Sequence, residues 1–570
     1  MTDQPAKFER QDAFGPLAVA LVALLSVVLT LDAAGDYPKL FEGPGITIDE
    51  SFNVQMGVYQ WRVLRQAHNF VLLLPESVEE FFGPKTKYNP DHPPLGRVWL
   101  GFWHDVAEWL FPPSDHPVDE HGIRFVTDCA RVGSATAFAL TIFLIGLFTT
   151  KWYGRTAGIV AAVSLVLMPR VFAHAHLASL ETFMNLTYSA TILAVAHWWQ
   201  VRRSGLSRPE SQPPEGGTTN VSLRLAVLTG VLFGLALLTK MQAILIPPVV
   251  GLWALWHWRV RAIKPLAIFG IVGLVVFFVG WPWLWLDPVT HFHEYFARTT
   301  SRAVLNCYYL GQVWADKEVP WHYPFVMFAV TVPAGLHLLG LLGAFSRRCE
   351  PRERLLLAAT LLPLVLFAVP SVAVYDGERL FLISYPMWAV LIGRGAEVAL
   401  SHLRRKSDAG PWRFVASQRS RGMAVTLFLL AQSVGVIQMH PCQLSYYNLL
   451  VGGLYGADRL GFERTYWGDS VTRSVLNSMP MTSEAPNVVV LPVLHHNQLD
   501  DLTRQSPILR KKRVQLRPDN DQQRNGSPDG WLMFSRKADV PPAAWGERNS
   551  VGVFRQNVKL AAWRSATEGL

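Results

Sequence analysis

Two adjacent carboxylates at the start of a long polar loop are the first residues in this chain that suit catalysis. Asp49 and Glu50 follow an apolar run at residues 14–31. A carboxylate near its ordinary pKa is ionised at neutral pH, so it can take the proton of a hydroxyl group that attacks an electrophilic carbon. The pair predicts general-base chemistry, although a solvated helix N-terminus is the simpler interpretation of such a pair taken alone.

A second polar motif stands later in the same loop, with the sequence Asp-His-Pro-Pro-Leu-Gly-Arg at residues 91–97. The two prolines make a rigid turn, and Gly and Arg follow at the start of an apolar stretch. This arrangement can hold His92 and Arg97 beside the membrane surface, where the phosphate of a lipid lies. The second motif therefore makes a functional interpretation of Asp49 and Glu50 more convincing.

Further charged residues stand at the edges of later apolar segments. Glu181 opens one segment, where the helix dipole alone explains an acidic residue. Lys240 interrupts another, and a cation near membrane depth costs roughly 2.5 kcal/mol or more unless it snorkels or finds a partner such as a phosphate. Asp376 and Arg379 either pair across a turn, or Arg379 binds a lipid phosphate.

Metal binding stays open at this point. His174 and His176 precede Glu181, and two histidines with a carboxylate can bind a divalent metal. Spacing this short without a third fixed ligand is more typical of structural histidines. No cofactor is certain, and a divalent metal is the alternative. The four cysteines lack Cys-x-x-Cys spacing, so they predict neither a zinc site nor a disulfide framework.

The order of these motifs resembles that of the protein O-mannosyltransferase family, bacterial type, within the GT-C glycosyltransferases. The first outside loop of that family carries an Asp-Glu pair and then an Asp-x-His-Pro-Pro-Leu-Gly-Lys motif, in which Arg97 here replaces the lysine. Residues 234–240 resemble the family's membrane-edge lysine motif. Residues 375–379 resemble a late outside loop of bacterial relatives, and the segments at 440–453 and 466–468 resemble the start of their soluble tail.

This resemblance implies an inverting enzyme that transfers a sugar from a polyprenyl-phosphate donor to an acceptor hydroxyl. The sugar would be mannose or another hexose or pentose, and the acceptor a protein, a lipid or a glycan. The tail does not look like the β-trefoil domain of eukaryotic protein mannosyltransferases, so the acceptor class stays open. The implied roles are Asp49 as catalytic base with Glu50 and Glu181 as further catalytic carboxylates, Arg97, Lys240 and Arg379 as donor-phosphate ligands, and Asp91, His92 and Asp376 as substrate-binding residues.

The composition indicates that these motifs are carried by a polytopic α-helical membrane protein. The chain has 570 residues, of which 50% are hydrophobic and only 17% charged. The net charge of +9 falls in short loops rather than along an aromatic-rich groove, which argues against a nucleic-acid partner. We expect eleven apolar spans, beginning near residues 13, 128, 156, 181, 223, 243, 265, 323, 354, 380 and 422.

Loop charges predict the orientation. With the N-terminus inside, every basic cluster falls on the cytoplasmic side, because Lys and Arg are retained in short cytoplasmic loops. These clusters lie near residues 151–155, 202–208, 259–264, 347–354 and 404–421. Asp49 and the tail would then face outward from a bacterial inner membrane.

Two domains are expected, a transmembrane GT-C catalytic domain at 1–438 and a small extracytoplasmic α/β domain at 439–570. The first outside loop, at 35–126, should contain interfacial helices near 52–74 and 95–111, because apolar and polar residues mix there. The predicted strands of the tail are 487–494, 513–517, 530–535 and 551–555.

Two other functions compete with a glycosyltransferase of this kind. A transporter would also have many spans, but transporters place their key polar residues near the bilayer midplane, often in repeated halves. The candidates here gather at one membrane face, and no repeat is visible. A polymerase or ligase that uses an oligosaccharide-lipid donor is the second alternative, and the nature of the donor would separate it from a monosaccharide transferase.

Overall fold

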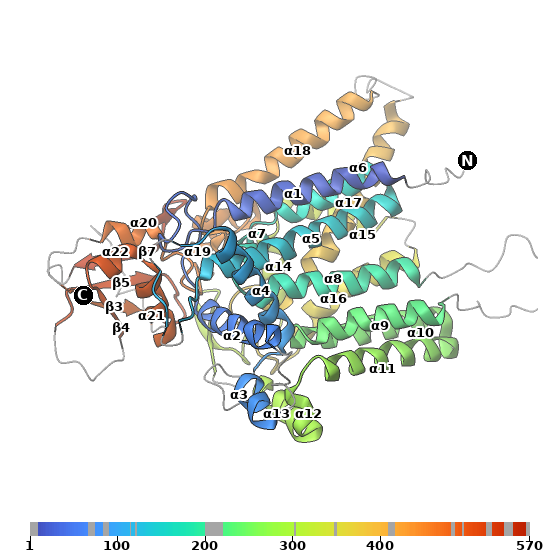
Figure 1. Cartoon of the computed structure of the whole chain (residues 1–570). Coiled ribbons are helices and arrows are strands. Elements are labelled where there is room, and N and C mark those ends of the chain that lie inside the picture. The colour runs from blue at the N-terminus through green and yellow to red at the C-terminus, as the bar shows by residue number, and fades with distance from the viewer. Residues whose placement is uncertain are drawn as a thin grey trace, which may run out of the picture.

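The structure is a computed structural model in which a helical bundle is followed by a small sheet domain. It describes residues 9–66, 74–83, 91–113, 116–119, 122–199, 221–300, 304–346, 350–407, 417–479, 485–492, 495–519, 527–540 and 551–565. The basic cluster at 202–208 lies outside these ranges, as do parts of the clusters at 347–354 and 404–421. Figure 1 shows the bundle with the red tail at one end.

The first loop contains helices at both predicted segments, near 52–74 and 95–111, and residues 67–73 of the first segment lie outside the described ranges. After α1 (Phe14–Val28), it contains α2 (Ile48–Arg65), α3 (Pro75–Phe82) and α4 (Pro94–Leu110). The α2 and α4 helices cross closely at Gly57 and Gly101, where a β-carbon on either residue would clash with the other helix backbone. In Figure 1 this pair lies at the end of the bundle that faces the tail. The first loop is therefore a packed part of the fold.

Helices occupy all eleven segments that were predicted to be spans. After α1 these helices are α5 (Thr127–Tyr153), α6 (Arg155–Val166), α8 (Leu180–Trp198), α9 (Leu223–Leu237), α10 (Ile246–Trp258), α11 (Ile263–Val279), the pair α14 (Tyr323–Thr331) and α15 (Ala334–Ala344), α16 (Pro351–Phe367), α17 (Ser384–Ser407) and α18 (Gln418–Met439). Shorter helices connect them: α7 (Pro169–Ala175), η4 (Met241–Leu245), η5 (Arg259–Ala262), α12 (Trp283–Leu286), α13 (Pro288–Thr300) and η6 (Arg379–Phe381).

Length and apolar composition identify fewer membrane spans than eleven. Among the described residues, four helical segments are long and apolar enough to cross a membrane, or six if the bent pairs α6/α7 and α14/α15 each count as one. Helices such as α16 and α17 are shorter or more charged, and Glu353 and Arg394 on them lie 3.8 Å apart. The chain has the apolar helices of an integral membrane protein, and the number of eleven spans stays a prediction.

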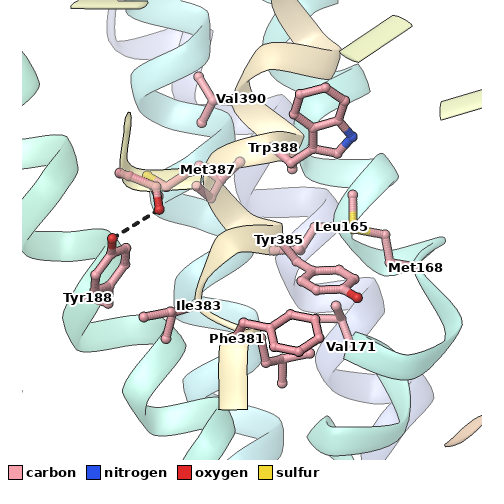
Figure 2. Packing of buried hydrophobic residues seen from close by; sticks show 14 of the residues in the cluster. Leu165, Met168, Val171, Tyr188, Phe381, Ile383, Tyr385, Met387, Trp388 and Val390 are labelled. Carbon is pink, nitrogen blue, oxygen red and sulfur yellow. Dashed lines mark hydrogen bonds between the residues drawn. The ribbon is translucent and has the colours of Figure 1, made fainter. Parts of the chain in front are cut away.

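The core anchors the segment that follows Arg379. Phe381 begins this packing, and Figure 2 shows Phe381 and Tyr385 beside Val171 and Met168. Tyr385 also forms a 2.7 Å hydrogen bond with Thr331 through the two hydroxyl groups. Because protein interiors are close-packed, this segment has little freedom to shift. The core therefore fixes the backbone from which the Arg379 side chain extends.

The tail contains the predicted small α/β domain. Its sheet has the order β4-β3-β5-β7-β6, in which β3 pairs parallel with β4 and β5, and β7 pairs antiparallel with β5 and β6. The strands are β3 (Asn487–Leu491), β4 (Gln515–Pro518), β5 (Gly530–Phe534), β6 (Val551–Arg555) and β7 (Val558–Ser565). The helices are α19 (Gly453–Arg459), α20 (Arg473–Ser478), α21 (His496–Gln505) and α22 (Pro507–Lys511), with single 3-10 turns η8 (Gln443–Ser445) and η9 (Leu449–Val451) before them.

Three strands were missed from the sequence, namely β7 and both strands of a separate hairpin. The β7 strand is buried from Leu560 to Trp563, so it lacks the alternation of a half-buried strand. It joins β6 through Gln556 and Asn557, both with positive φ, as a tight hairpin turn requires. A separate hairpin, β1 (Asn306–Tyr309) and β2 (Gln312–Ala315), lies before α14. The predicted strands at 487–494, 513–517, 530–535 and 551–555 overlap β3 to β6, and residues 493–494 lie outside the described ranges.

Candidate active site

Five charged side chains from distant parts of the chain meet at one point. The guanidinium of Arg379 donates to Glu181 Oε1 at 2.7 Å, to Asp376 Oδ2 at 3.2 Å and to Asp49 Oδ2. Lys240 Nζ donates to the same Glu181 oxygen at 2.5 Å. Three carboxylates thus share two cations. All five residues were candidates from the sequence, and the structure brings them together.

Local backbone structure explains how these side chains are presented. Asp49 lies in the first turn of α2 and Glu181 in the first turn of α8, where the helix dipole favours negative charge. Lys240 lies between α9 and η4 and has an extended backbone conformation, so it separates the two helices. Arg379 begins η6, after Asp376 and Gly377, which both have positive φ. These tight turns direct the Asp376 and Arg379 side chains toward the helix ends.

Glu50, the neighbour of Asp49, makes different contacts. Its Oε1 accepts from Arg131 Nε at 2.8 Å and from the Ala178 amide at 2.6 Å, while its Oε2 accepts from Arg131 Nη2 at 2.9 Å and from the Thr47 amide at 2.9 Å. The carboxylate is fully buried. Glu50 therefore holds the start of α2 in place and makes none of the contacts of the Arg379 cluster.

Arg131 was not singled out from the sequence. It donates all five guanidinium hydrogens, two to Glu50 and one each to the carbonyl oxygens of Leu31, Pro44 and Gly45. An unpaired arginine near the start of a predicted span is energetically unfavourable in the membrane, so its presence there indicates a buried partner. This was the feature of the sequence from which Arg131 could have been identified. The partner, however, lies 81 positions earlier in the chain.

The His-Pro-Pro motif packs against the ends of α8 and α9. The Leu95 amide donates to the Leu238 carbonyl at 3.0 Å, and a β-carbon on Gly96 would lie 2.9 Å from a methyl carbon of Leu180. Arg97 is buried and donates to Asp91 Oδ1 at 2.8 Å and to Asn53 Oδ1 at 3.2 Å. The motif thus lies next to the segments that carry Glu181 and Lys240, although Arg97 is neutralised by Asp91. The preceding residues 88–90 lie outside the described ranges.

Burial changes the acid-base properties of two candidates in the first loop. Burial raises the pKa of the Asp49 carboxyl above its usual range, although the Arg379 charge opposes this shift. Burial also lowers the pKa of His92 to about 4. The charges of Arg97 and Lys240 act in the same direction, whereas the charge of Asp91 opposes the shift. His92 is therefore neutral at physiological pH, and it interacts electrostatically with Lys240.

A small pocket with an empty volume of about 180 Å³ adjoins the cluster. Its lining residues are Glu181, Met184, Asn185, Lys240, Gln242, Arg379, Leu380, Leu382 and Ile383. One part of the wall is therefore cationic and another part aliphatic. Cationic donors suit a phosphate, and an aliphatic wall suits a hydrocarbon chain.

The two histidines considered for a metal do not converge. His176 forms hydrogen bonds to Thr30 Oγ1 at 2.8 Å and to the Phe172 carbonyl at 2.9 Å, so both ring nitrogens are used. His174 is buried, and neither ring nitrogen has a hydrogen-bond partner among the described residues. Its Nε2 lies 4.0 Å from Glu378 Oε1.

A different group has the spacing of metal ligands. It consists of His104, Asp105 and Glu108, and it is the one such group found within the part of the chain that the structure describes. Arg62 pairs with Asp105 at 3.1 Å and with Glu108 at 3.5 Å. Ion pairing accounts for these carboxylates, so they do not single out a metal centre.

One aromatic side chain from the start of the tail completes the cluster. The Trp467 ring lies under the Arg379 guanidinium, with 4.3 Å between the guanidinium carbon and the ring centroid. Its Nε1 donates to Asp376 Oδ2 at 3.0 Å, and Arg536 reaches Asp376 Oδ1 at 3.2 Å. The sequence identified Trp467 as part of a family-like segment without assigning it a role.

A second pocket, of about 220 Å³ empty volume, lies beyond Asp376 on the tail side. It is lined by Asn306, Cys307, Tyr308, Tyr323, Asp376, Gly377, Glu463, Tyr466 and Arg536. Unlike the first pocket, it has tyrosines in its wall and no aliphatic side chain. Asp376 therefore lies between two chemically different cavities.

Several solved structures match this chain, in whole or in part, at low identity. Apo ArnT from Cupriavidus metallidurans matches with 15% identity, 97% coverage of each chain and a TM-score of 0.47. The Archaeoglobus fulgidus oligosaccharyltransferase matches with 12% identity, 86% coverage of this chain and 63% of the other, and a TM-score of 0.42. The S. cerevisiae Pmt1-Pmt2 protein O-mannosyltransferase complex bound to the sugar donor matches with 14% identity, 52% coverage of this chain and 35% of the other, and a TM-score of 0.30.

A comparison with curated protein sequences finds no match. A family model described as dolichyl-phosphate-mannose-protein mannosyltransferase matches residues 84–296. This range includes Arg97, Glu181 and Lys240, and it ends before Arg379. The match confirms the resemblance of this chain to the protein O-mannosyltransferase family of glycosyltransferases.

Proposed function

We propose that this protein is an inverting glycosyltransferase that moves a sugar from a polyprenyl-phosphate donor to an acceptor hydroxyl. The observation that carries the proposal is the convergence of Asp49, Lys240 and Arg379 beside a pocket with an aliphatic wall. A proton acceptor and two phosphate-binding cations are the groups that this reaction requires. The family match over residues 84–296 supports the same class of reaction.

Lys240 and Arg379 bind the donor phosphate in this proposal. A guanidinium can bind two phosphate oxygens at once, and an ammonium adds a compact charge beside it. Met184, Leu380 and Ile383, from the same pocket, would contact the first part of the lipid chain. Both cations are held by the single carboxylate of Glu181, so the phosphate must compete with that carboxylate for them.

Asp49 is the proposed catalytic base. It removes the proton from the acceptor hydroxyl while the acceptor oxygen forms a bond to the anomeric carbon of the sugar. The bond from that carbon to the phosphate oxygen breaks, and its electron pair stays on the phosphate, where Lys240 and Arg379 stabilise the added charge. Attack from the face opposite the phosphate inverts the anomeric configuration.

The remaining candidates support this centre. Glu181 is proposed to keep the two cations together before the donor arrives, and Glu50 to orient α2 through Arg131. The His-Pro-Pro motif lies against the backbone before Lys240, so Asp91, His92 and Arg97 are proposed to shape the donor side of the site. Asp376 orients Arg379.

The location of the reaction follows from the loop charges. We propose that the site and the tail face outward from a bacterial inner membrane, because the basic loops fall on the opposite side. Labelling of Asp49→Cys in intact cells by a membrane-impermeant maleimide should succeed, whereas labelling of Lys151→Cys should require disruption of the membrane. The reverse pattern would place the site on the cytoplasmic face and contradict the proposal.

Transfer by the purified protein is the direct test. The protein in nanodiscs should transfer radiolabelled sugar from a monosaccharide polyprenyl phosphate to protein, lipid or glycan acceptors, and Asp49→Asn should abolish most of this transfer. Transfer from oligosaccharide-lipid donors alone would indicate the polymerase or ligase alternative. Movement of a substrate across sealed vesicles without any transfer would indicate a transporter.

A further inference from the structure

The short segment at residues 465–471, here called the junction segment, lies between α19 and α20 of the tail and contacts the Arg379 side of the site. Trp467 within it is almost completely buried. Its ring covers one face of the Arg379 guanidinium, and its Nε1 binds the Asp376 oxygen that also binds Arg379. A cation over an aromatic face is attracted by the negative face of the ring, and more strongly when water is excluded.

This contact fixes the orientation of the guanidinium. The hydrogens of a guanidinium lie in its plane, so they serve the carboxylates of Asp49, Glu181 and Asp376 at its edges. The Trp467 ring takes the face, which no hydrogen bond can use. Edge contacts alone leave the group free to tilt, whereas an aromatic face removes that freedom.

The same segment also contacts the Asp49 side of the site. The Gly45 amide donates to the Asp469 carbonyl at 2.7 Å, and a β-carbon on Gly45 would clash with the Val471 carbonyl oxygen. Gln498 in α21 donates from Nε2 to the Ile46 carbonyl at 2.8 Å and approaches the Trp467 carbonyl at 3.5 Å. Residues 45–47 lead directly into α2, so these contacts determine where α2 begins and thereby the position of Asp49 in its first turn.

The body of the tail holds the junction segment in place. Arg536 donates to the Tyr466 carbonyl at 2.7 Å, and within the segment itself Thr465 donates to Asp469 Oδ1 at 2.5 Å. Ile46 from the first loop is buried in the hydrophobic core of the tail with Val471 and Leu532. Figure 1 shows the tail against the end of the bundle that carries α2, where α21 contacts it.

From these contacts we infer that the junction segment sets the position of Asp49 relative to Arg379, with Trp467 as the positioning residue. The inference rests on the proposed function, because it assigns the base and the phosphate ligand to those two residues. The tail then serves the reaction by its docking, and the membrane part is incomplete without it. A segment that only packs the tail onto the bundle would affect stability alone.

A double-mutant cycle between Trp467 and Arg379 separates these two roles. Trp467→Leu should lower kcat about 10- to 100-fold, because small misplacements of reacting groups cost this much. Trp467→Phe should have an intermediate effect on kcat, since it keeps a smaller aromatic face and loses the Nε1 donor. In an Arg379→Lys background, Trp467→Leu should have a much smaller effect, because an ammonium has no planar face to cover.

The same cycle is measured on the binding of polyprenyl phosphate to the purified protein, so that a very slow Arg379→Lys enzyme still gives a result. Trp563→Phe, in the hydrophobic core of the tail, is the matched control for a loss of tail stability. It should lower the melting temperature and leave kcat unchanged. Gly45→Ala should lower kcat because of its clash with Val471, whereas Gly251→Ala, in open space on α10, should not.

An equal fall in kcat for Trp467→Leu in the wild-type and Arg379→Lys backgrounds would overturn the inference. A fall in activity that is fully explained by a lower melting temperature would overturn it as well. Failure of the proposed function would look different. In that case Arg379→Lys, Lys240→Gln and Asp49→Asn would themselves leave sugar transfer unchanged, whatever Trp467 does.

Discussion

Two buried ion clusters flank the start of α2, and they differ in how completely their charges are satisfied. The Glu50–Arg131 pair is fully buried, and every hydrogen of that guanidinium has an acceptor. In the Arg379 cluster the guanidinium makes three hydrogen bonds to carboxylates of the described residues, one of which, Asp376, also pairs with Arg536. The cluster borders a pocket, and the Asp49 side chain is 27% exposed. A saturated cluster can do no more than hold structure, whereas an unsaturated one beside a cavity has charges to give to a ligand.

The largest expected effect comes from the base in the unsaturated cluster. Asp49→Asn keeps the shape of the side chain and removes the proton acceptor, so kcat should fall about 10²- to 10⁴-fold with a small change in donor KM. Asp458→Asn, which changes an aspartate paired with Arg464 at 2.6 Å in the tail, is the matched control and should retain kcat. Near-normal kcat in Asp49→Asn would leave Glu181 as the next candidate base.

The saturated cluster should respond in stability instead. Arg131→Gln leaves the buried Glu50 carboxylate without its partner, and breaking such a pair costs about 3–5 kcal/mol. A large fall in melting temperature is therefore expected in detergent or nanodiscs. Arg62→Gln, in a partly exposed ion network, should cost no more than about 1 kcal/mol. Equal melting temperatures for the two variants would show that saturation does not distinguish these clusters.

Phosphate binding should depend on Lys240. Lys240→Gln removes one charge-assisted hydrogen bond, worth about 1.5–3 kcal/mol, so donor affinity should fall roughly 10- to 150-fold. Affinity for a polyprenyl phosphate can be measured directly by titration. Lys151→Gln, at the far end of α5, controls for general loss of positive charge. Unchanged affinity in Lys240→Gln would remove this lysine from the donor site.

The smallest effect is expected in the pH profile. Burial raises the pKa of Asp49 and the Arg379 charge opposes it, and only the ionised carboxylate can accept a proton. Activity should therefore be lost as pH falls through this raised pKa, so the acidic limb of kcat should lie above the ordinary aspartate value of about 4. Asp49→Glu should move the limb, and an identical limb in this variant would contradict the assignment.

The sequence predicts the elements better than it predicts their contacts. The helices at the predicted spans and in the first loop follow from local apolar patterns, and Lys240 stands out because a cation in an apolar stretch is costly. Asp49 and Glu50 could not be told apart, because the partners that distinguish them, Arg379 and Arg131, are remote in the chain. Trp467 carries no local sign of its contact with Arg379. The β7 strand was missed because its buried centre has no alternation.

Ile46 belongs to the hydrophobic core of the tail, together with Val488 and Leu532. This shared core has a consequence for the order of synthesis. At about 5–20 residues per second, a ribosome needs roughly 20 to 90 seconds to advance from Ile46 to Val488. During that interval the first loop has emerged but part of its core is not yet made. The loop that carries Asp49 therefore reaches its final packing only near the end of translation, and a chain that stops early would leave this apolar residue open to proteases and chaperones.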